Sequence, residues 1–580
     1  MFLAIPGGIL EYIAISYVWG DPIGTREITV NNETLNVTVN LELALRHIRL
    51  NWDNITKASF FPNRLDSGYG PLWVDAICID QSNIDERSQQ VEMMREIYSG
   101  AHLVLSWLGT STPQLSLAVS TLRLIEANVD ASSDDPDWSW AKQYPQVWER
   151  VGQKPNELWT AIQALFSLPY WTRIWIIQEI VLSSRALFLI GNELLQFETY
   201  KSFINSLRVF SKPGTANTTE SWFDDLLHNG ILATFPTMTI AILPPLNTGF
   251  KIGQLLPLPR LLARFKEGYA ASDPRDLIFA VLGISKFGIK PDYTKTVLEI
   301  YTLVALNWVN IKFEPCLDFL LCSGYGQNTR DTSWPSWVPD WRAMQNRDFL
   351  TCPWIVLRGD VQHSADLGLP AESPKLEVSP ILCVAGVLTD FVVSLEDPVD
   401  KVVTIEDAFT YALRFIVNST RPTGPSEPCL TGLLGCLTWD SVFENENEKR
   451  NFSTTFLYAM RDFIVENDVQ DIPPWLQETL GKLKPTKDWT STAIRRLIKK
   501  EPFLQRICHT AGGRIAAVSP KAGIQDYIAV IPGCSCPVLL RKVRDHFIHL
   551  GPCFVDGLMN GEVAEMLEAG KVKMEDIEIR

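Results

Sequence analysis

Several features of common protein classes are missing from this sequence. Its most apolar stretch, at about 231–246, is broken by Pro236, Pro244 and Pro245 and is shorter than the roughly 20 residues that a membrane-spanning helix needs. The chain begins without a basic segment followed by a long apolar one, so we expect no signal peptide. No block of basic residues stands out against the net charge of −15, which argues against nucleic acid as a partner.

Cysteine and histidine show no ligand spacing either. The eleven cysteines are scattered without a C-x-x-C pair, and Cys534 and Cys536 lie too close together for a zinc knuckle. The seven histidines are dispersed along the chain. We therefore expect reduced thiols in a cytoplasmic protein, with no metal site and no bound cofactor.

The short motifs of several enzyme classes are absent as well. The chain contains no G-x-x-x-x-G-K-[ST], G-x-G-x-x-G, H-E-x-x-H or G-x-S-x-G. Nucleotide hydrolysis, dinucleotide redox chemistry, metalloprotease activity and α/β-hydrolase activity therefore lack their usual sequence support. What is present is a globular composition, with 46% hydrophobic and 21% charged residues. A length of 580 residues predicts two or three domains.

Residues 11 to about 200 alternate short apolar runs with amphipathic segments. Four runs read as strands buried on both faces, at 12–18, 72–79, 102–108 and 185–190. Residues 27–39 read as a hairpin around Asn31 and Asn32, and Asn40 is placed to cap the helix that follows. Further helices are expected behind residue 82 and over 170–182. This alternation predicts a doubly wound α/β layer with a parallel sheet, in which ligands bind at the C-terminal strand ends.

The composition changes further along the chain and predicts three regions. The α/β domain covers 1–200 and contains a polar insertion at about 110–157. A mainly helical middle region follows at 201–350, with Pro-rich joints. Residues 351–580 form a smaller β-rich α+β domain, with a helical insertion at about 402–500.

Three ordered blocks of the first region resemble the fungal heterokaryon-incompatibility (HET) domain. They read ISYVWGD at 15–21, LWVDAICIDQ at 72–81 and YWTRIWIIQE at 170–179. The later chain resembles the region that commonly follows HET domains, through DPRD at 273–276 and WPSWVPDW at 334–341. The resemblance covers nearly the whole chain and implies a role in non-self recognition and programmed death of fused cells.

The HET domain is in turn similar to Toll/interleukin-1 receptor (TIR) domains. Many TIR domains cleave NAD at the nicotinamide bond with a glutamate of a late helix, and the matching position here is Glu179. The resemblance therefore implies a TIR-like, flavodoxin-like sheet and NAD as a substrate rather than a cofactor. It also implies that the loop after residue 79 mediates self-association.

The residues around Glu179 are compatible with that chemistry. Glu179 follows Trp175 by four residues and Trp171 by eight, so a helix over 170–182 would place all three on one face. A carboxylate in a partly dry cleft stabilises the oxocarbenium charge that forms when an N-glycosidic bond breaks. The alternative is a solvent-facing glutamate on a helix packed by its apolar neighbours.

Further candidates lie at the predicted strand ends. Trp19 is placed to stack on a nicotinamide or adenine ring, or to close the edge of the sheet. Asp21 either contacts a ribose or begins a turn with Pro22, and the turn is favoured. The candidate ligand-binding residues are Ser16, Trp19, Gly20, Asp21, Asp80 and Trp175, where Asp80 replaces the asparagine usual in the HET family.

A second set is expected to serve structure or self-association. Asp75 lies inside a predicted apolar strand, where an unpaired charge would cost several kcal/mol, and Arg87, Arg95 and Arg173 are its candidate partners. This set comprises Asp75, Gln81, Glu86, Arg87 and Arg173. Two functions remain open: a TIR-like NAD glycohydrolase activated by clustering, and a non-catalytic module that signals by binding itself or other proteins.

Overall fold

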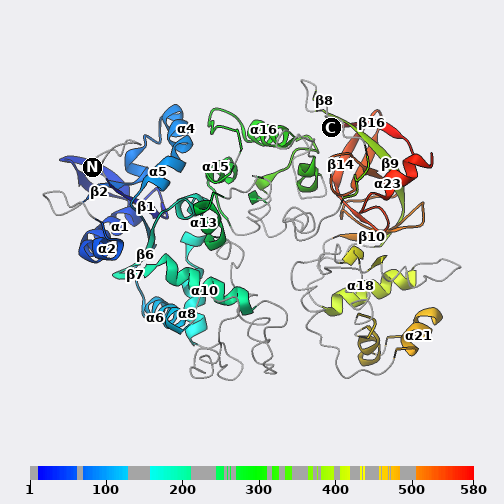
Figure 1. Cartoon of the computed structure of the whole chain (residues 1–580), viewed down its shortest axis with the longest axis horizontal. Coiled ribbons are helices and arrows are strands. Elements are labelled where there is room, and N and C mark those ends of the chain that lie inside the picture. The colour runs from blue at the N-terminus through cyan, green and yellow to red at the C-terminus, as the bar shows by residue number, and fades with distance from the viewer. Residues whose placement is uncertain are drawn as a thin grey trace. The chain divides into compact units, whose positions relative to one another are not determined.

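The computed structural model places most of the chain in two compact units. The first comprises Met1–Val297 with Met344–Arg347, and the second comprises Leu298–Ala343 with Asp348–Arg580 (Figure 1). The residues that the structure describes are 11–61, 70–128, 157–210, 243–253, 258, 261–262, 269–285, 287–309, 317–324, 334–342, 364–369, 375–376, 381–396, 405–418, 432–433, 435–437, 456–458, 460–467, 469–470, 472–483 and 505–580. None of the helices within these ranges is long and apolar enough to cross a membrane.

The first unit is built on a five-stranded sheet. Its strand order is β4 (Leu72–Trp73), β1 (Ile13–Tyr17), β5 (Leu103–Gly109), β6 (Ala186–Ile190) and β7 (Glu193–Gln196). The first four strands are parallel, and β7 pairs with β6 in the antiparallel direction. Taken in chain order, the parallel strands follow the second-first-third-fourth arrangement of flavodoxin-type sheets. The predicted N-terminal parallel sheet is thus confirmed.

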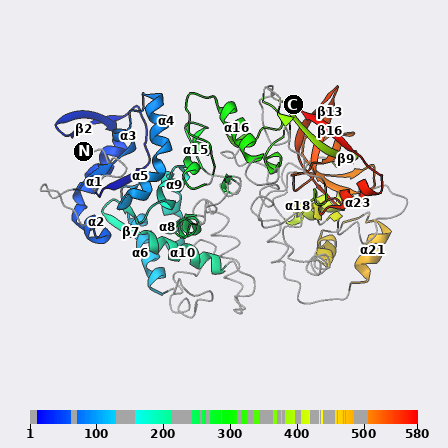
Figure 2. The same ribbon diagram turned by 45° about the horizontal axis from the view of Figure 1, so that its top comes forward.

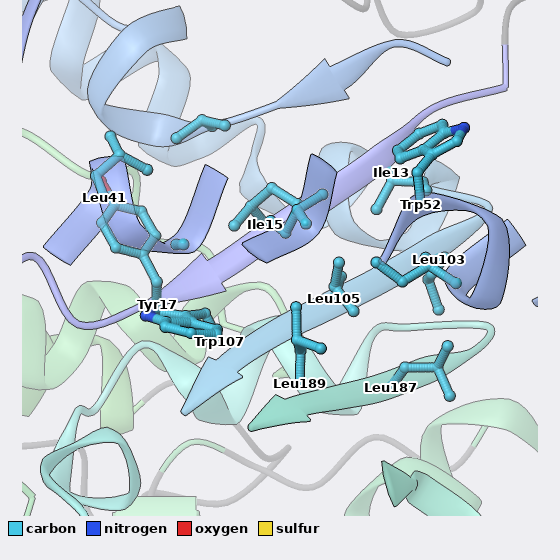
Figure 3. Close-up of a cluster of buried hydrophobic side chains, with 14 of the residues drawn as sticks. Ile13, Ile15, Tyr17, Leu41, Trp52, Leu103, Leu105, Trp107, Leu187 and Leu189 are labelled. Carbon is cyan, nitrogen blue, oxygen red and sulfur yellow. The ribbon is translucent and has the colours of Figure 1, made fainter. Parts of the chain in front are cut away.

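One face of this sheet is entirely apolar and carries helices α1 (Val39–Leu50) and α2 (Trp52–Ser59). Because side chains alternate along a strand, every second residue of β1, β5 and β6 points to this face. Figure 3 shows the residues that fill it: Ile13, Ile15, Tyr17, Leu41, Trp52, Leu103, Leu105, Trp107, Leu187 and Leu189.

The opposite face contacts η2 (Pro169–Thr172) and α9 (Ile176–Val181). Helix α9 also lies beside α5 (Met94–Gly100) and α15 (Asp276–Leu282) (Figure 2). The sheet therefore has helical elements on both faces, as a doubly wound layer requires.

The predicted hairpin is confirmed. Strands β2 (Thr25–Val30) and β3 (Glu33–Thr38) pair from Thr25 opposite Thr38 to Val30 opposite Glu33. Asn31 and Asn32 form the two-residue turn with φ of 50° and 67°. Such a turn needs two positive φ angles, which asparagine tolerates better than most residues.

Two element predictions and one cap are wrong. The strand expected over 72–79 stops at Trp73 and continues as the one-turn helix α3 (Asp75–Cys78), in which the Asp75 carboxylate accepts a hydrogen bond from the amide of Ala76 at 2.7 Å. A short helix thus spares the carboxylate from lying unpaired in a strand interior. Helix α1 is capped by Thr38 rather than by Asn40, whose side chain instead bonds Val18 and Trp107.

The helix expected over 170–182 is interrupted. Arg173 is extended and forms a parallel bridge with Ala270, whose amide donates to Thr172 at 2.5 Å and whose carbonyl accepts from Ile174 at 3.3 Å. These pairings separate η2 from α9. Trp171, Trp175 and Glu179 therefore do not share one continuous helix.

The remaining helices of the first unit are α4 (Ile84–Glu92), α6 (Pro113–Asn128), α8 (Glu157–Phe166), α10 (Phe197–Phe210) and α13 (Leu243–Lys251). Helix α6 occupies the beginning of the predicted insertion at 110–157, and residues 129–156 lie outside the described part of the chain.

The second unit is β-rich, as predicted. Its strands are β8 (Lys375–Leu376), β9 (Leu382–Leu395), β10 (Arg506–Thr510), β11 (Ile515–Val518), β12 (Tyr527–Val530), β13 (Val538–Val543), β14 (His546–Pro552), β15 (Phe554–Val555) and β16 (Met574–Ile579). The long strand β9 pairs with both β12 and β16, so the path through β12, β13, β14 and β16 closes into a ring. Helices and turns of this unit include α16 (Val297–Val309), η4 (Asp318–Cys322), α18 (Ile405–Asn418), α21 (Pro474–Gly481) and α23 (Glu562–Glu568).

Candidate functional site

A polar stripe crosses the face of the parallel sheet that is opposite the apolar core. Ser16 of β1 and Ser106 of β5 are paired in register on neighbouring strands, and both are buried. The hydroxyl of Tyr170 lies 2.7 Å from the Ser16 hydroxyl and donates to the Ser106 hydroxyl at 2.8 Å. Two serines at matching positions of adjacent parallel strands thus bind one phenol from η2.

Glu179 is held against this stripe by helix α9. Its side chain accepts a hydrogen bond from Ser16, although the two residues are 163 positions apart in the chain. The guanidinium of Arg173 lies 3.7 Å from the same carboxylate oxygen. Glu179 is only 3% exposed, and this burial raises the pKa of its carboxyl, although Arg173 and the Ser16 hydrogen bond act in the opposite direction. A carboxyl in this setting exchanges its proton at a higher pH than usual.

Asp75 is the second acid of the site. Its carboxylate accepts a hydrogen bond from the indole of Trp19 at 2.8 Å, and burial raises its pKa in spite of the nearby Arg173. Burial also disfavours the charged form of Arg173, yet Glu179 and Asp75 outweigh that effect and raise the pKa of the guanidinium. Arg173 is therefore a cation influenced by the buried Glu179 and the partly buried Asp75, and its Nη1 atom makes no hydrogen bond.

Three tyrosines complete the cluster. Tyr98 of α5 is buried and hydrogen-bonds Glu179, while Tyr17 at the end of β1 hydrogen-bonds Asp75. The pKa values of Tyr17, Tyr98 and Tyr170 are all raised, chiefly by burial. These phenols stay protonated at neutral pH; Tyr98 and Tyr17 donate to the two carboxylates, whereas Tyr170 bonds the two serines.

The other predicted residues near the end of β1 lie at the surface. Trp19 is 41% exposed and reaches the site through its contact with Asp75. Gly20 has a φ of +79°, and a Cβ atom there would lie 3.2 Å from the Cβ of Asn40, so glycine is favoured. Asp21 accepts from the amide of Ile23 at 2.9 Å, which is the turn interaction that the sequence favoured over ribose binding.

The predicted loop after the second strand is not part of the buried cluster. Asp80 is exposed and accepts from the amide and hydroxyl of Ser82 at 3.0 and 2.6 Å, while Glu86 accepts from the amide of Asp80 at 3.0 Å. Asn83 caps α4 by accepting from Asp85 and Glu86. Gln81 approaches the cluster through the backbone of Asp75, at 3.4 Å.

Trp175 and Arg87 belong to a second cluster. The indole of Trp175 donates to Asp276 at 3.2 Å, and Arg87 lies 3.4 Å from Asp273 and stacks over the ring of Tyr293 at 3.6 Å. Arg173, rather than Arg87 or Arg95, is thus the arginine that influences Asp75. The side chains of Trp175 and Arg87 thus bind residues of this second cluster, and the contact of Trp175 with Glu179 is a backbone hydrogen bond.

Sequence reasoning missed Tyr98, Ser106, Tyr170 and Asp276. A signal existed for Ser106, because it is a lone polar residue in the apolar strand LVLSWLG, just as Ser16 is in IAISY. Asp276 gave no such signal, since its partner Trp175 is 101 residues away. Within the described residues no group of three or more histidine, cysteine or acidic side chains is arranged to hold a metal ion.

Chemically, the cluster offers a carboxyl with a raised pKa, a guanidinium and several hydroxyl donors, with an exposed aromatic ring nearby. Among the residues that the structure describes, no histidine and no reactive cysteine belongs to this cluster. Cys78 is the cysteine of this region, and burial raises the pKa of its thiol to about 11. The arrangement therefore suits electrostatic stabilisation of a developing positive charge rather than thiol catalysis.

Comparison with known proteins gives one family and one curated relative. Residues 12–179 match the family model described as heterokaryon incompatibility protein (HET). Over 651 aligned positions the chain is 24% identical to heterokaryon incompatibility protein 6, OR allele, of Neurospora crassa. This alignment covers 96% of the chain and 90% of the relative. No solved structure matches.

Proposed function

We propose that the chain is a heterokaryon-incompatibility (HET) domain protein that acts in the cytoplasm as an effector of fungal non-self recognition. The similarity to the Neurospora protein extends over both units of the chain, which supports a common role for the whole molecule. In this proposal the HET domain starts the death of incompatible fused cells after it associates with itself or with another protein.

The chemical step that we propose is hydrolysis of NAD at the bond between nicotinamide and ribose. Water adds its oxygen to ribose C1′, the C1′–N bond breaks with its electron pair leaving on neutral nicotinamide, and the proton of the water is released. Because nicotinamide in NAD is already cationic, its departure needs no general acid. The task of the protein is to stabilise the positive charge that develops on the ribose.

Glu179 is the residue to which we assign that task. The observation that carries the proposal is a buried carboxyl with a raised pKa, held on the polar face of a flavodoxin-ordered parallel sheet by Ser16 and Arg173. Sheets of this order bind nucleotides near the C-terminal ends of their strands. Trp19 lies at that end of β1 with 41% of its surface exposed, and an indole there can stack on a planar base.

The burial of Glu179 means that substrate must displace some of the side chains around it. We propose that self-association of HET domains causes this rearrangement. Ionised Glu179 is the active form, so nicotinamide release should increase with pH through a pKa above the usual range of a glutamate.

The test is release of nicotinamide from NAD by the full-length chain, both free in solution and crowded on a surface. Glu179→Gln should lower the crowded rate about a hundredfold or more, because an amide cannot balance the ribose charge. Glu27→Gln, on the exposed strand β2, is the matched control and should keep the wild-type rate. Equal rates in the wild type and Glu179→Gln, or no release from a folded, crowded wild type, would overturn the enzymatic proposal.

One observation favours the second candidate function, a non-catalytic signalling module. Ser16, Arg173 and Tyr98 already bind the Glu179 carboxyl, and little of it is exposed. In this second function the Glu179 carboxyl has a structural role, which is to orient α9 on the sheet. If cell death in the fungus persists with Glu179→Gln but is abolished by variants that prevent self-association, the signalling function is the correct one.

A further inference from the structure

Helix α9, which carries Glu179, is held at its C-terminal end by a residue from beyond the matched HET region. The side-chain amide of Asn247, in α13, donates to the carbonyls of Ile180, Val181 and Ser183 at 3.2, 3.0 and 3.3 Å. These carbonyls belong to the last turn of α9 and the residues after it, where a helix lacks internal donors. Asn247 is 2% exposed, so water does not substitute for it easily.

The N-terminal end of α9 is held in a similar way. Ala270 pairs with the backbone of Thr172 and Ile174, immediately before the helix. Asp276 then accepts the indole hydrogen of Trp175, whose carbonyl accepts from the amide of Glu179 at 3.1 Å. The acceptor for the Glu179 amide is therefore a residue, Trp175, whose side chain is held by Asp276.

Asp276 itself is fixed by a network that leads back to α4. Tyr293 donates its hydroxyl hydrogen to Asp276, and Arg87 stacks on the Tyr293 ring while pairing with Asp273 at 3.4 Å. Arg275 bonds Asp273 at 2.9 and 2.7 Å and the carbonyls of Tyr293 and Lys295 at 2.7 Å each. Hydrogen bonds therefore join the DPRD motif at 273–276 to the segment 293–295.

The middle of α9 is contacted through a glycine. A Cβ atom on Gly283, at the end of α15, would lie 2.7 Å from the amide terminus of Gln178 and 3.2 Å from the Cβ of Arg95. The Gln178 amide is oriented to donate to Ala280 at 3.0 Å and to accept from Arg95 at 3.3 Å. A methyl group at position 283 would displace the end of the buried Gln178 side chain and press on Arg95, where α15 lies against α9 (Figure 2). Because Gln178 directly precedes Glu179, this displacement would act on the segment that carries Glu179.

We propose that the described segments between residues 243 and 295 form a clamp that positions α9, with Asn247, Asp276 and Gly283 as positioning residues for Glu179. Helix α9 has only six residues, and so short a helix is not stable without tertiary contacts. The clamp supplies contacts at its beginning, middle and end. It follows that the working HET unit extends to about residue 297 and that a fragment ending near residue 200 loses the orientation of Glu179.

The first test compares two glycine substitutions in the full-length chain. Gly283→Ala should raise the hydrogen-exchange rates of the amides of Ile176–Val181 at least tenfold, because the added methyl group displaces Gln178 and Arg95. Gly288→Ala is the matched control, since no atom lies within 4 Å of a Cβ there and its φ is not positive. Equal protection of α9 in both variants would overturn the clamp.

A second variant covers the case in which Gly283→Ala does not fold. Asp276→Asn keeps the size of the side chain and one acceptor oxygen but weakens the contacts with Trp175 and Tyr293. We expect faster exchange at Glu179 than in the wild type, with β5 and β6 unchanged. Unchanged exchange at Glu179 would count against Asp276 as a positioning residue.

The importance of the clamp for activity rests on the proposed function, but its effect on exchange does not. If Gly283→Ala loosens α9 and lowers nicotinamide release, both proposals stand. If it loosens α9 in a protein whose wild type never releases nicotinamide, the clamp stands and the enzymatic proposal fails. If release falls while α9 stays fully protected, the clamp is wrong and the enzymatic proposal remains.

Discussion

The two units of this protein bury polar groups in different ways. In the parallel-sheet unit, Glu179 and Arg173 form an ion pair at 3.7 Å within the cluster that includes the three buried tyrosines. One nitrogen of the guanidinium has no hydrogen-bond partner. In the β-rich unit, the acids Asp390, Asp526 and Glu396 each pair with an arginine that reaches solvent, at 3.3, 2.8 and 3.1 Å. His549 of this unit is 0% exposed.

This difference separates a candidate site from a scaffold. Charges buried together and imperfectly satisfied are expensive, and proteins concentrate them where chemistry or switching needs them. In the second unit the acids are also buried, but their arginine partners are partly exposed to water, which stabilises the cation of each pair. The contrast therefore favours the first unit as the place of the candidate site.

The largest effect should come from removing the buried cation. Arg173→Leu leaves Glu179 and Asp75 without a compensating charge and should lower the free energy of unfolding of the first unit by about 3–5 kcal/mol at neutral pH. Arg541→Leu removes a partner of Asp526 that is 42% exposed, and should cost the second unit about 1 kcal/mol or less. Denaturant-dependent hydrogen exchange, analysed separately for the two sheets, measures both values. Similar losses of stability in both units would contradict the difference between their buried ion pairs.

Acid should weaken the second unit through His549. Burial lowers the pKa of this imidazole to about 3, so between pH 6.5 and 3 the unfolded state binds a proton that the folded state does not. Stability therefore falls as the pH decreases, by about 2 kcal/mol between pH 6.5 and 5. Urea unfolding of the wild type and of His549→Asn at the two pH values tests this. The variant should lose the slope, and an unchanged slope would show that other groups cause it.

The first unit should respond to acid in the opposite direction through Asp276. Burial raises the pKa of this carboxyl to about 6, so between about pH 4 and 6 the folded state binds a proton that the unfolded state lacks. This contribution to stability is largest at low pH and is lost as the pH rises through 6. Acidification from pH 6.5 to 5 should add about 1 kcal/mol to the first unit. The same exchange experiment detects it, and Asp276→Asn should abolish the gain.

The smallest effect concerns helix capping. Helix α4 of the first unit begins at a side-chain cap, Asn83, whereas α23 of the second begins after Gly561 without one. Asn83→Ala should cost about 1 kcal/mol, because two amides of the first turn lose their acceptor. Thermal unfolding monitored by circular dichroism is sufficient. A loss of nicotinamide release beyond what the lower stability explains would show that the loop after residue 79 also takes part in function.

Local patterns predicted much of the first sheet. The strands around Ile15, Leu105 and Phe188 follow from short apolar runs, and the hairpin follows from Asn31 and Asn32. Glu179 and Ser16 were both chosen from the sequence, although their direct contact was not predicted. No local pattern could show it, because the two residues are brought together only by the pairing of strands and the docking of α9.

Periodicity and short apolar runs were enough to predict the parallel α/β layer and the β-rich second region, because both depend on local patterns. The assignment of Glu179 as the acid follows from the family resemblance and stays a prediction. Tertiary structure alone decided where strand β4 stops, why the helix breaks at Arg173 and which residues hold α9. In each case the deciding partner is distant: Trp19 for Asp75, Ala270 for Arg173 and Asp276 for Trp175. A buried polar group must find a partner wherever the fold provides one, and that requirement overrides local helix and strand preference.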